Sequence, residues 1–167
     1  MRAFAVRLTP GADLKAELAR LTEANALRAG CILSCVGSLS QARLRMPGAV
    51  GDPEVITTFV EPLEIVSLTG TLCPDGLHVH ISLSRRDGSC LGGHLVQGCL
   101  VHTTAELVIG DLPEVEFHRL PDPATGYNEL SVQPLSPPRS GGRGTARRTA
   151  GGGGGEPQAG RTRLRRE

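Results

Sequence analysis

Apolar and polar residues alternate along much of the first 135 positions, which predicts a chain built mainly of short β-strands. The segment LHVHISLS, residues 77–84, alternates without interruption. Its four apolar residues share one face of a strand, while His78, His80 and two serines share the other. Weaker patterns of the same kind predict further strands over residues 3–8 and 31–46, one or two within 54–73, one or two within 94–112, and a last one at 114–120.

A single segment has helical rather than strand periodicity. Leucines recur at helical spacing, at Leu14, Leu18 and Leu21. Thr9 or Asp13 can cap the beginning of this helix, and Gly30 is well placed to end it, so we predict a helix over about residues 12–28. One main helix among about seven strands joined by short turns indicates an α+β domain with a mainly antiparallel sheet. Residues 121–130 are expected to form a loop.

The pattern stops near residue 136. We therefore expect a folded domain over residues 1–135 and a disordered tail, rich in Gly, Arg and Pro, over 136–167. Residues 139–167 carry eight Arg and two Glu, a net charge of +6, whereas residues 1–138 carry ten basic and fifteen acidic groups, a net charge of −5. Tail arginines are candidates for sequence-independent contacts to nucleic acid, the alternative being a merely solvated tail: Arg139, Arg143, Arg147, Arg148, Arg161, Arg163, Arg165 and Arg166.

Composition narrows the functional classes further. The chain has three Phe, one Tyr and no Trp. These are too few aromatic residues to form a binding surface of stacked rings, as many proteins that bind single-stranded nucleic acid have. The five cysteines are scattered without a CxxC pair, and no run reaches the roughly 20 apolar residues of a membrane span. No signal peptide is recognisable. We therefore expect an intracellular protein, cytoplasmic or nuclear, with reduced thiols and no membrane partner.

Three of the five histidines lie within 17 residues of one another. His78 and His80 are two positions apart on the predicted strand, so their imidazoles point the same way about 6.5 Å apart. His94 follows Gly92 and Gly93 and is expected to begin the next strand, from which it can supply a third nitrogen. Three histidines with an open fourth position are a common arrangement for Zn²⁺.

Two further residues are candidates for this site, His102 and Glu106, and a simpler interpretation is that the histidines bind no ligand. His102 shares the face of His94 only if the strand between them is unbroken. Glu106 is the only candidate for a proton-transferring carboxylate that the sequence suggests beside the cluster. The alternative is that HVH places two histidines on a solvated strand face without any ligand.

Several longer motifs resemble the plant-and-prokaryote-conserved (PPC) domain. They are LTPGADLKAELARLTEANALRAGCILSCVGSLSQARLR, EIVSLTGTL, LHVHISLSRRDGSCLGGHLVQGCLV and TTAELVI, in the order of that family. The resemblance covers about residues 3–120. It implies an antiparallel sheet with flanking helices, a homotrimer, and His78, His80 and His94 as candidate metal ligands, as in members from bacteria and archaea.

In land plants the domain follows AT-hooks in nuclear proteins and contacts transcription factors. This chain departs from the plant version, because residues 61–66 read EPLEIV where the plant domain has Gly-Arg-Phe-Glu-Ile-Leu, and no Arg-Gly-Arg-Pro core is present. We therefore expect a prokaryote-like, non-enzymatic homotrimeric module with a zinc site. Its expected partners are other copies of the same chain, and DNA or transcription-related proteins are further candidates. The alternative is a zinc-dependent enzyme acting on a small molecule.

Overall fold

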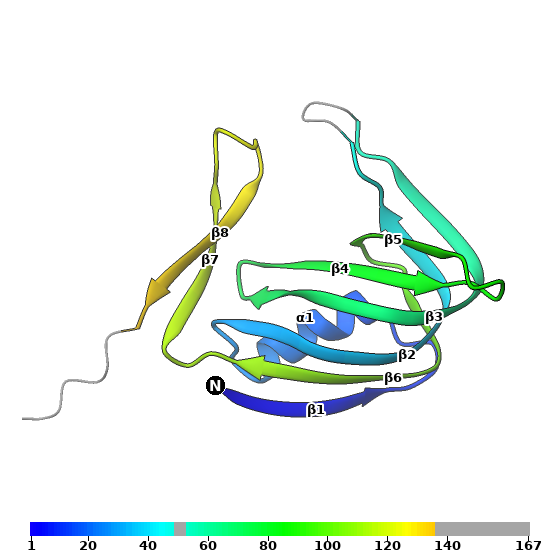
Figure 1. Ribbon diagram of the computed structural model, residues 1–167. Helices are drawn as coiled ribbons and strands as arrows, with labels where there is room; N and C mark the ends of the chain where they lie inside the picture. Colours follow the sequence, from blue (N-terminus) through cyan, green and yellow to red (C-terminus); the bar gives the residue numbers. More distant parts are fainter. Residues whose placement is uncertain (49–52, 136–167) are drawn as a thin grey trace, which may run out of the picture. The chain divides into compact units, whose positions relative to one another are not determined.

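The computed structural model describes residues 1–48 and 53–135, which form eight strands and one helix in the order β1 α1 β2 β3 β4 β5 β6 β7 β8 (Figure 1). The predicted antiparallel architecture is confirmed, with one strand more than the sequence indicates. The tail from residue 136, including all eight of its arginines, lies outside the described residues. The bounds are β1 Arg2–Leu8, α1 Leu14–Ala24, β2 Gly30–Arg45, β3 Ile56–Cys73, β4 Gly76–Ser84, β5 Cys90–Leu95, β6 Leu100–Asp111, β7 Val115–Pro121 and β8 Asn128–Pro134.

Six strands form one antiparallel sheet in the order β1-β6-β2-β3-β4-β5. β5 also pairs with the end of β2, through Leu44 opposite Leu95 and Arg45 opposite His94. The circuit from β2 through β3, β4 and β5 back to β2 is therefore closed by hydrogen bonds. This closure brings the end of β2 beside β5, from which it is separated by more than 40 positions in the sequence.

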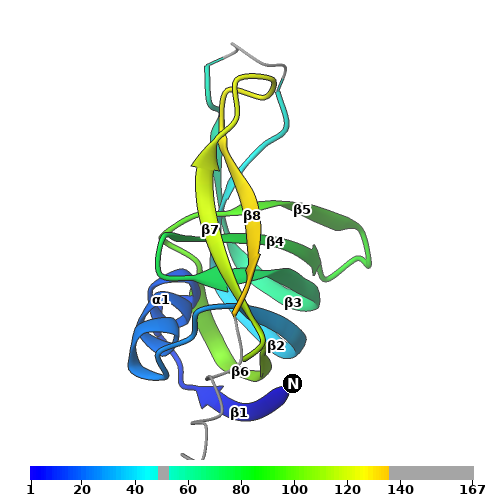
Figure 2. The ribbon, with the colours of Figure 1, turned by 90° about the vertical axis from the view of Figure 1, so that its left-hand side faces the viewer.

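The helix begins later and ends earlier than the leucine spacing predicts, at Leu14 and Ala24 instead of residues 12 and 28. Asp13 caps it by accepting hydrogen bonds from the backbone N–H groups of Lys15 and Ala16. The other carboxylate oxygen of Asp13 accepts from the N–H of Gly98 at 2.7 Å, which ties the helix to the segment between β5 and β6. Figure 2 shows α1 against one side of the sheet, where its three leucines are buried in the main core.

β3 runs without a break from Ile56 to Cys73, although Pro62 lies inside it. The register against β2 shifts between Leu39 and Gln41, next to this proline. A bulge of this kind lets a strand accommodate a residue that has no N–H to donate. One strand therefore stands where the sequence left one or two open.

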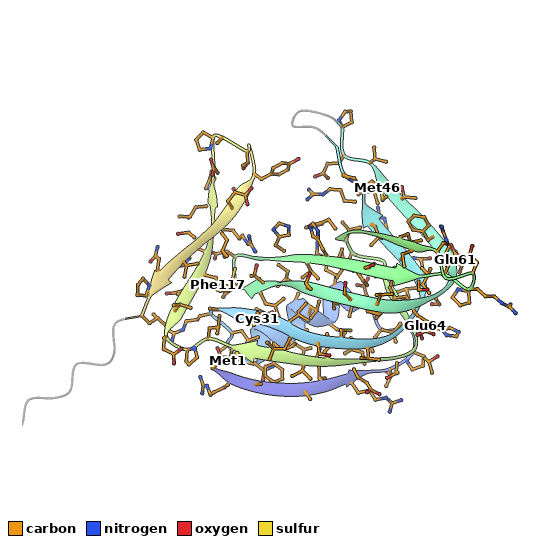
Figure 3. All side chains as sticks on the ribbon, in the orientation of Figure 1. Met1, Cys31, Met46, Glu61, Glu64 and Phe117 are labelled. Atoms are coloured by element: carbon orange, nitrogen blue, oxygen red, sulfur yellow. The ribbon has the colours of Figure 1, made fainter. Side chains whose placement is uncertain are left out.

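The C-terminal strands form a separate two-stranded sheet. Residues 121–130 were expected to be a loop, but Asn128 already begins β8, which pairs with β7 along its whole length. Phe117, labelled in Figure 3, anchors β7 by packing in a small second core with Ala29 and Cys73. Figure 1 shows this hairpin and the extended ends of β2 and β3 rising on either side of β4 and β5.

Within the described residues, no helix has the length and apolar character that a membrane crossing requires. All five cysteines lie in the described part of the chain as free thiols.

Candidate metal centre

β4 presents two of the candidate ligands on one face. Val79, Ile81 and Leu83 are buried in the main core, so the intervening His78 and His80 must face outward. Their Nε2 atoms lie 3.1 Å apart. Two nitrogens bound to one tetrahedral zinc ion, each at about 2.0–2.1 Å, are separated by about 3.3 Å. The observed pair therefore already has nearly the spacing that such an ion requires.

The third imidazole comes from β5. His94 was expected to begin a strand, but it is the next-to-last residue of β5, directly opposite His80 in the antiparallel pair. Residues in such pairs project from the same face of a sheet. The ring centroid of His94 lies 5.2 Å from that of His78 and 5.4 Å from that of His80.

Gly92 and Gly93 allow the strands to approach closely at this point. A Cβ on Gly92 would lie 2.6 Å from the carbonyl oxygen of Ile81, and one on Gly93 would lie 2.9 Å from that of Arg45. Both distances are shorter than real Cβ contacts allow, so β5 fits between β4 and β2 only because these side chains are absent. This packing agrees with the prediction that the glycine pair lets the backbone come close to the site.

Each of the three histidines offers one ring nitrogen, and these three nitrogens all lie within 4.8 Å of one another. The structure thus brings together the three residues that the sequence singled out. Nδ1 of His94 is buried and has no hydrogen-bond partner among the described residues. Burying a nitrogen without a hydrogen-bond partner costs free energy. No hydrogen bond within the described residues holds the His94 ring, so it is free to bind a metal ion. The three histidines therefore fit such an ion.

Burial and neighbouring charges favour the neutral form of His78 and of His94. Burial, followed by the positive charges of Arg45 and Lys15, lowers the pKa of His94 to about 4. Burial, followed by the neighbouring His80 and Arg119, also lowers the pKa of His78. Because a metal ion binds the neutral form of imidazole, His78 and His94 are ready to coordinate at neutral pH without first losing protons.

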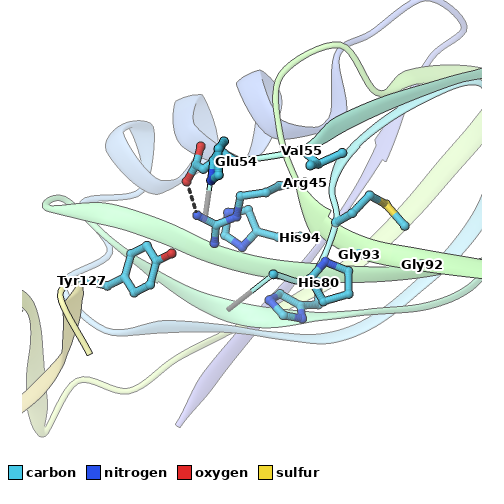
Figure 4. Close-up of a pocket in the computed structure, with 12 residues that line it drawn as sticks. Arg45, Glu54, Val55, His80, Gly92, Gly93, His94 and Tyr127 are labelled. Atoms are coloured by element: carbon cyan, nitrogen blue, oxygen red, sulfur yellow. Dashed lines mark hydrogen bonds and ion pairs between the residues drawn. The ribbon is translucent and has the colours of Figure 1, made fainter. Parts of the chain in front are cut away.

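Open pockets surround the cluster, and residues from distant parts of the chain line them. A pocket of about 450 Å³ is bordered by His80, His94, Arg45 and Tyr127, which Figure 4 shows around its opening. A second one, of about 250 Å³, contacts His78 and His94 and is lined by charged residues that the sequence did not indicate: Arg45, Asp75, Arg119 and Glu129.

The two arginines are held in place by contacts of their own. Nη1 of Arg45 forms an ion pair with Glu54 at 2.7 Å, and its guanidinium lies 5.6 Å from the centre of the Tyr127 ring. Nη2 of Arg119 donates to Oγ1 of Thr71, the residue directly opposite His78 on β3. Both cations are thereby fixed beside the imidazoles.

The remaining candidates lie elsewhere. His102 is exposed on β6, because the strand that would have carried it alongside His94 is broken at residues 96–99. Glu106 is opposite Arg7 of β1, and two strands, β2 and β3, separate β6 from β4. Three carboxylates do line the pockets around the cluster, Glu54, Asp75 and Glu129, and Glu129 of β8 lines two of these pockets.

Comparison with known proteins agrees with these motifs and this fold. Residues 1–113 match the model of the Plants and Prokaryotes Conserved (PCC) domain. The chain belongs to this family. A curated relative, the bifunctional protein GlmU of a Synechococcus strain, is 51% identical over 136 residues, which are 81% of this chain. The chain spans about a fifth of the length of that relative, 21%.

Two solved structures are similar over most of this PCC chain. A hypothetical protein from Salmonella enterica is 41% identical, with a TM-score of 0.74 over 80% of this chain and 94% of its own. A protein from Archaeoglobus fulgidus named as metal-containing is 26% identical, with a TM-score of 0.66 over 78% of this chain and 94% of its own.

Proposed function

We propose that the protein is a non-enzymatic homotrimeric module of the PCC family that holds one Zn²⁺ per chain on His78, His80 and His94. The observation that carries the metal site is the convergence of three imidazoles from two paired strands, with ligand nitrogens within 4.8 Å. The metal-containing name of the Archaeoglobus relative supports it. Bound there, the ion would cross-link β4 to β5 and keep a fourth position open toward the pockets.

Metal analysis tests this site. The purified chain, dialysed against buffer with trace zinc, is expected to retain about one equivalent, whereas His78→Ala and His80→Ala are expected to retain almost none. His102→Ala is the matched control, because it removes an exposed histidine outside the cluster. A wild-type chain that holds no more metal than the two cluster variants would refute the site.

The trimer part of the proposal follows from family membership and from exposed apolar side chains. Val36 on β2 and Val60 and Val66 on β3 are 63%, 76% and 58% exposed, and a second copy of the chain would cover such residues. Among the described strands, β1 pairs with β6 alone, which leaves an edge that assembly can also cover. Size-exclusion chromatography with light scattering is expected to give three times the chain mass, and a monomer at micromolar concentration would contradict it.

Glu129 favours a second candidate, a zinc-dependent enzyme acting on a small molecule. The sequence suggested only Glu106 as a proton-transferring carboxylate, but Glu129 lines two pockets that contact His78. A carboxylate near an open metal position can accept a proton from a bound molecule. Turnover that requires zinc and falls at least a hundredfold in Glu129→Gln, with zinc content unchanged, would favour the enzyme over the non-enzymatic module.

The basic tail remains a prediction of sequence-independent nucleic-acid contact. Its arginines would release counterions from phosphates, so the affinity should fall steeply with salt. A gel shift at two salt concentrations, with and without residues 139–167, measures this. DNA binding that survives the deletion unchanged would assign the contact to another surface.

A further inference from the structure

The side chains around the histidines form a row across four adjacent strands. Arg45 is opposite His94, His94 is opposite His80, and His80 is opposite Thr69. A cation at the end of β2 therefore stands next to the candidate metal ligands on the same face of the sheet. Arg119 approaches from β7 and is hydrogen-bonded to Thr71, which faces His78.

Both arginines line the pocket of about 250 Å³ that also contacts His78 and His94. Neither guanidinium uses all of its N–H donors in hydrogen bonds to the described residues. Arg45 is fixed by Glu54 through one terminal nitrogen, and Arg119 is fixed by Thr71 through one terminal nitrogen. A guanidinium has five N–H donors, so each keeps donors for a further acceptor.

The net charge around the cluster changes sign when a divalent metal ion is added. Around the three pockets that contact the cluster there are two positive side chains, Arg45 and Arg119, and three negative ones, Glu54, Asp75 and Glu129. Two of these acids already have partners, because Glu54 pairs with Arg45, and Asp75 accepts from His118 and from the backbone of Arg119. A divalent ion would convert a net charge of −1 into +1, which one negatively charged group neutralises.

We propose that the metal-loaded pocket binds a small molecule through a carboxylate or phosphate group, which Arg45 and Arg119 hold against the open metal position. This inference rests on the proposed metal site. Forked guanidinium groups recognise both kinds of oxyanion, and a pocket of about 250 Å³ has room for a small molecule that carries one. The negative charge of Glu129 repels the anionic group of the ligand. Its carboxylate can accept a hydrogen bond from a hydroxyl elsewhere on the same ligand.

Cobalt substitution makes the site visible. Co²⁺ takes the place of Zn²⁺ at nitrogen sites and its visible absorption reports directly on what occupies the fourth position. The cobalt-loaded chain is titrated with oxalate, with inorganic phosphate and with uncharged ethylene glycol. We expect one or both anions to change the spectrum at millimolar concentration, ethylene glycol to leave it unchanged, and the stronger of the two anions to identify the oxyanion class.

Three variants separate this anion site from a structural role of the arginines. Arg119→Gln and Arg45→Gln should weaken the anion about tenfold or more, since each removes a charge-assisted hydrogen bond. Glu129→Gln should strengthen it, because a repelling charge is lost. Arg86→Gln is the control, since Arg86 is exposed in the turn after β4 and lines none of these pockets.

Metal content measured on every variant distinguishes the two ways of failing. A wild-type chain that loads cobalt but shows no spectral response to either anion overturns the anion site and leaves the metal site standing. A chain that loads no metal overturns both. Equal anion affinity in wild type, Arg119→Gln and Arg45→Gln, with full metal content, would refute the assignment of the arginines.

Discussion

Gly70 on β3 lies opposite Val79 of β4, the neighbouring strand that carries two of the histidines, and replacing it with alanine should disturb fold and site together. The added Cβ would lie 2.3 Å from the carbonyl oxygen of His78 and 2.8 Å from Cα of Val79. Ordinary contacts begin at 3.4 Å, so β3 and β4 must separate locally by about 1 Å. Both collisions involve backbone atoms, which cannot rotate away as a side chain can.

The magnitude follows from two opposing effects. Forcing extra volume into a packed region costs about 1–3 kcal/mol, whereas replacing glycine by alanine lowers the entropy of the unfolded chain and recovers about 0.4–1 kcal/mol. We expect Gly70→Ala to lower the free energy of unfolding by about 1–2 kcal/mol. Ligand positions must hold to about 0.2 Å, so a displacement of His78 by about 1 Å should weaken zinc binding at least tenfold.

Urea unfolding of the metal-free chain and a competition titration with a zinc chelator measure the two effects. Gly110→Ala is the matched control, because a Cβ on this strand glycine would meet the flexible side chains of Cys31 and Met1 at 3.1 Å. It should change neither quantity by much. If Gly70→Ala behaves like Gly110→Ala in both measurements, the close approach of β3 to β4 is not what positions His78.

Two further predictions concern the core and the helix cap. Asp13→Ala should lower the free energy of unfolding by about 2 kcal/mol, because it removes the cap of α1 and the acceptor for the Gly98 N–H, whereas Asp13→Asn should cost less; urea unfolding compares them. Burial raises the pKa of Cys35 and of Cys99 to about 11, so at pH 8 a thiol reagent should modify exposed Cys90 quickly and these two only after unfolding. Because unfolded thiols ionise near pH 9, the stability that comes from keeping both protonated should be present below pH 9 and be lost between about pH 9 and 11. Equal modification rates for the three thiols, or unchanged stability across that range, would contradict this placement.

The main sheet could be predicted from the sequence because its strands bury one face. Val79, Ile81 and Leu83 alternate with polar residues, and the core that they enter leaves no other assignment for β4. β8 could not be found in the same way. Tyr127, just before it, and Val132 within it are about half exposed, so no apolar face marks the strand, and it is held by backbone pairing to β7.

Some residues of the candidate site could likewise be predicted from the sequence, and others could not. His78 and His80 could be paired from their spacing alone, since every second residue of a strand faces the same way. Arg119 and Glu129 reach the cluster from a hairpin that packs beside the main sheet, and nothing local in FHRL or YNEL indicates it. Arg45 required knowledge that β2 closes onto β5, a pairing of few residues that no periodicity reveals.

The position of His94 shows how the core determines the chemistry on the opposite face. Leu91 is opposite the buried Leu83 and packs against the main core, and Leu95 of the same strand is fully buried, so apolar contacts hold β5 in this register. A slip of one residue would turn Leu91 and Leu95 toward solvent and His94 toward the core, which the hydrophobic effect opposes strongly. The register that packs these leucines against the core is thus the one that sets His94 across from His80. The pairing of β5 with β4 therefore brings the three imidazoles together, with their ring nitrogens close enough to share one ion.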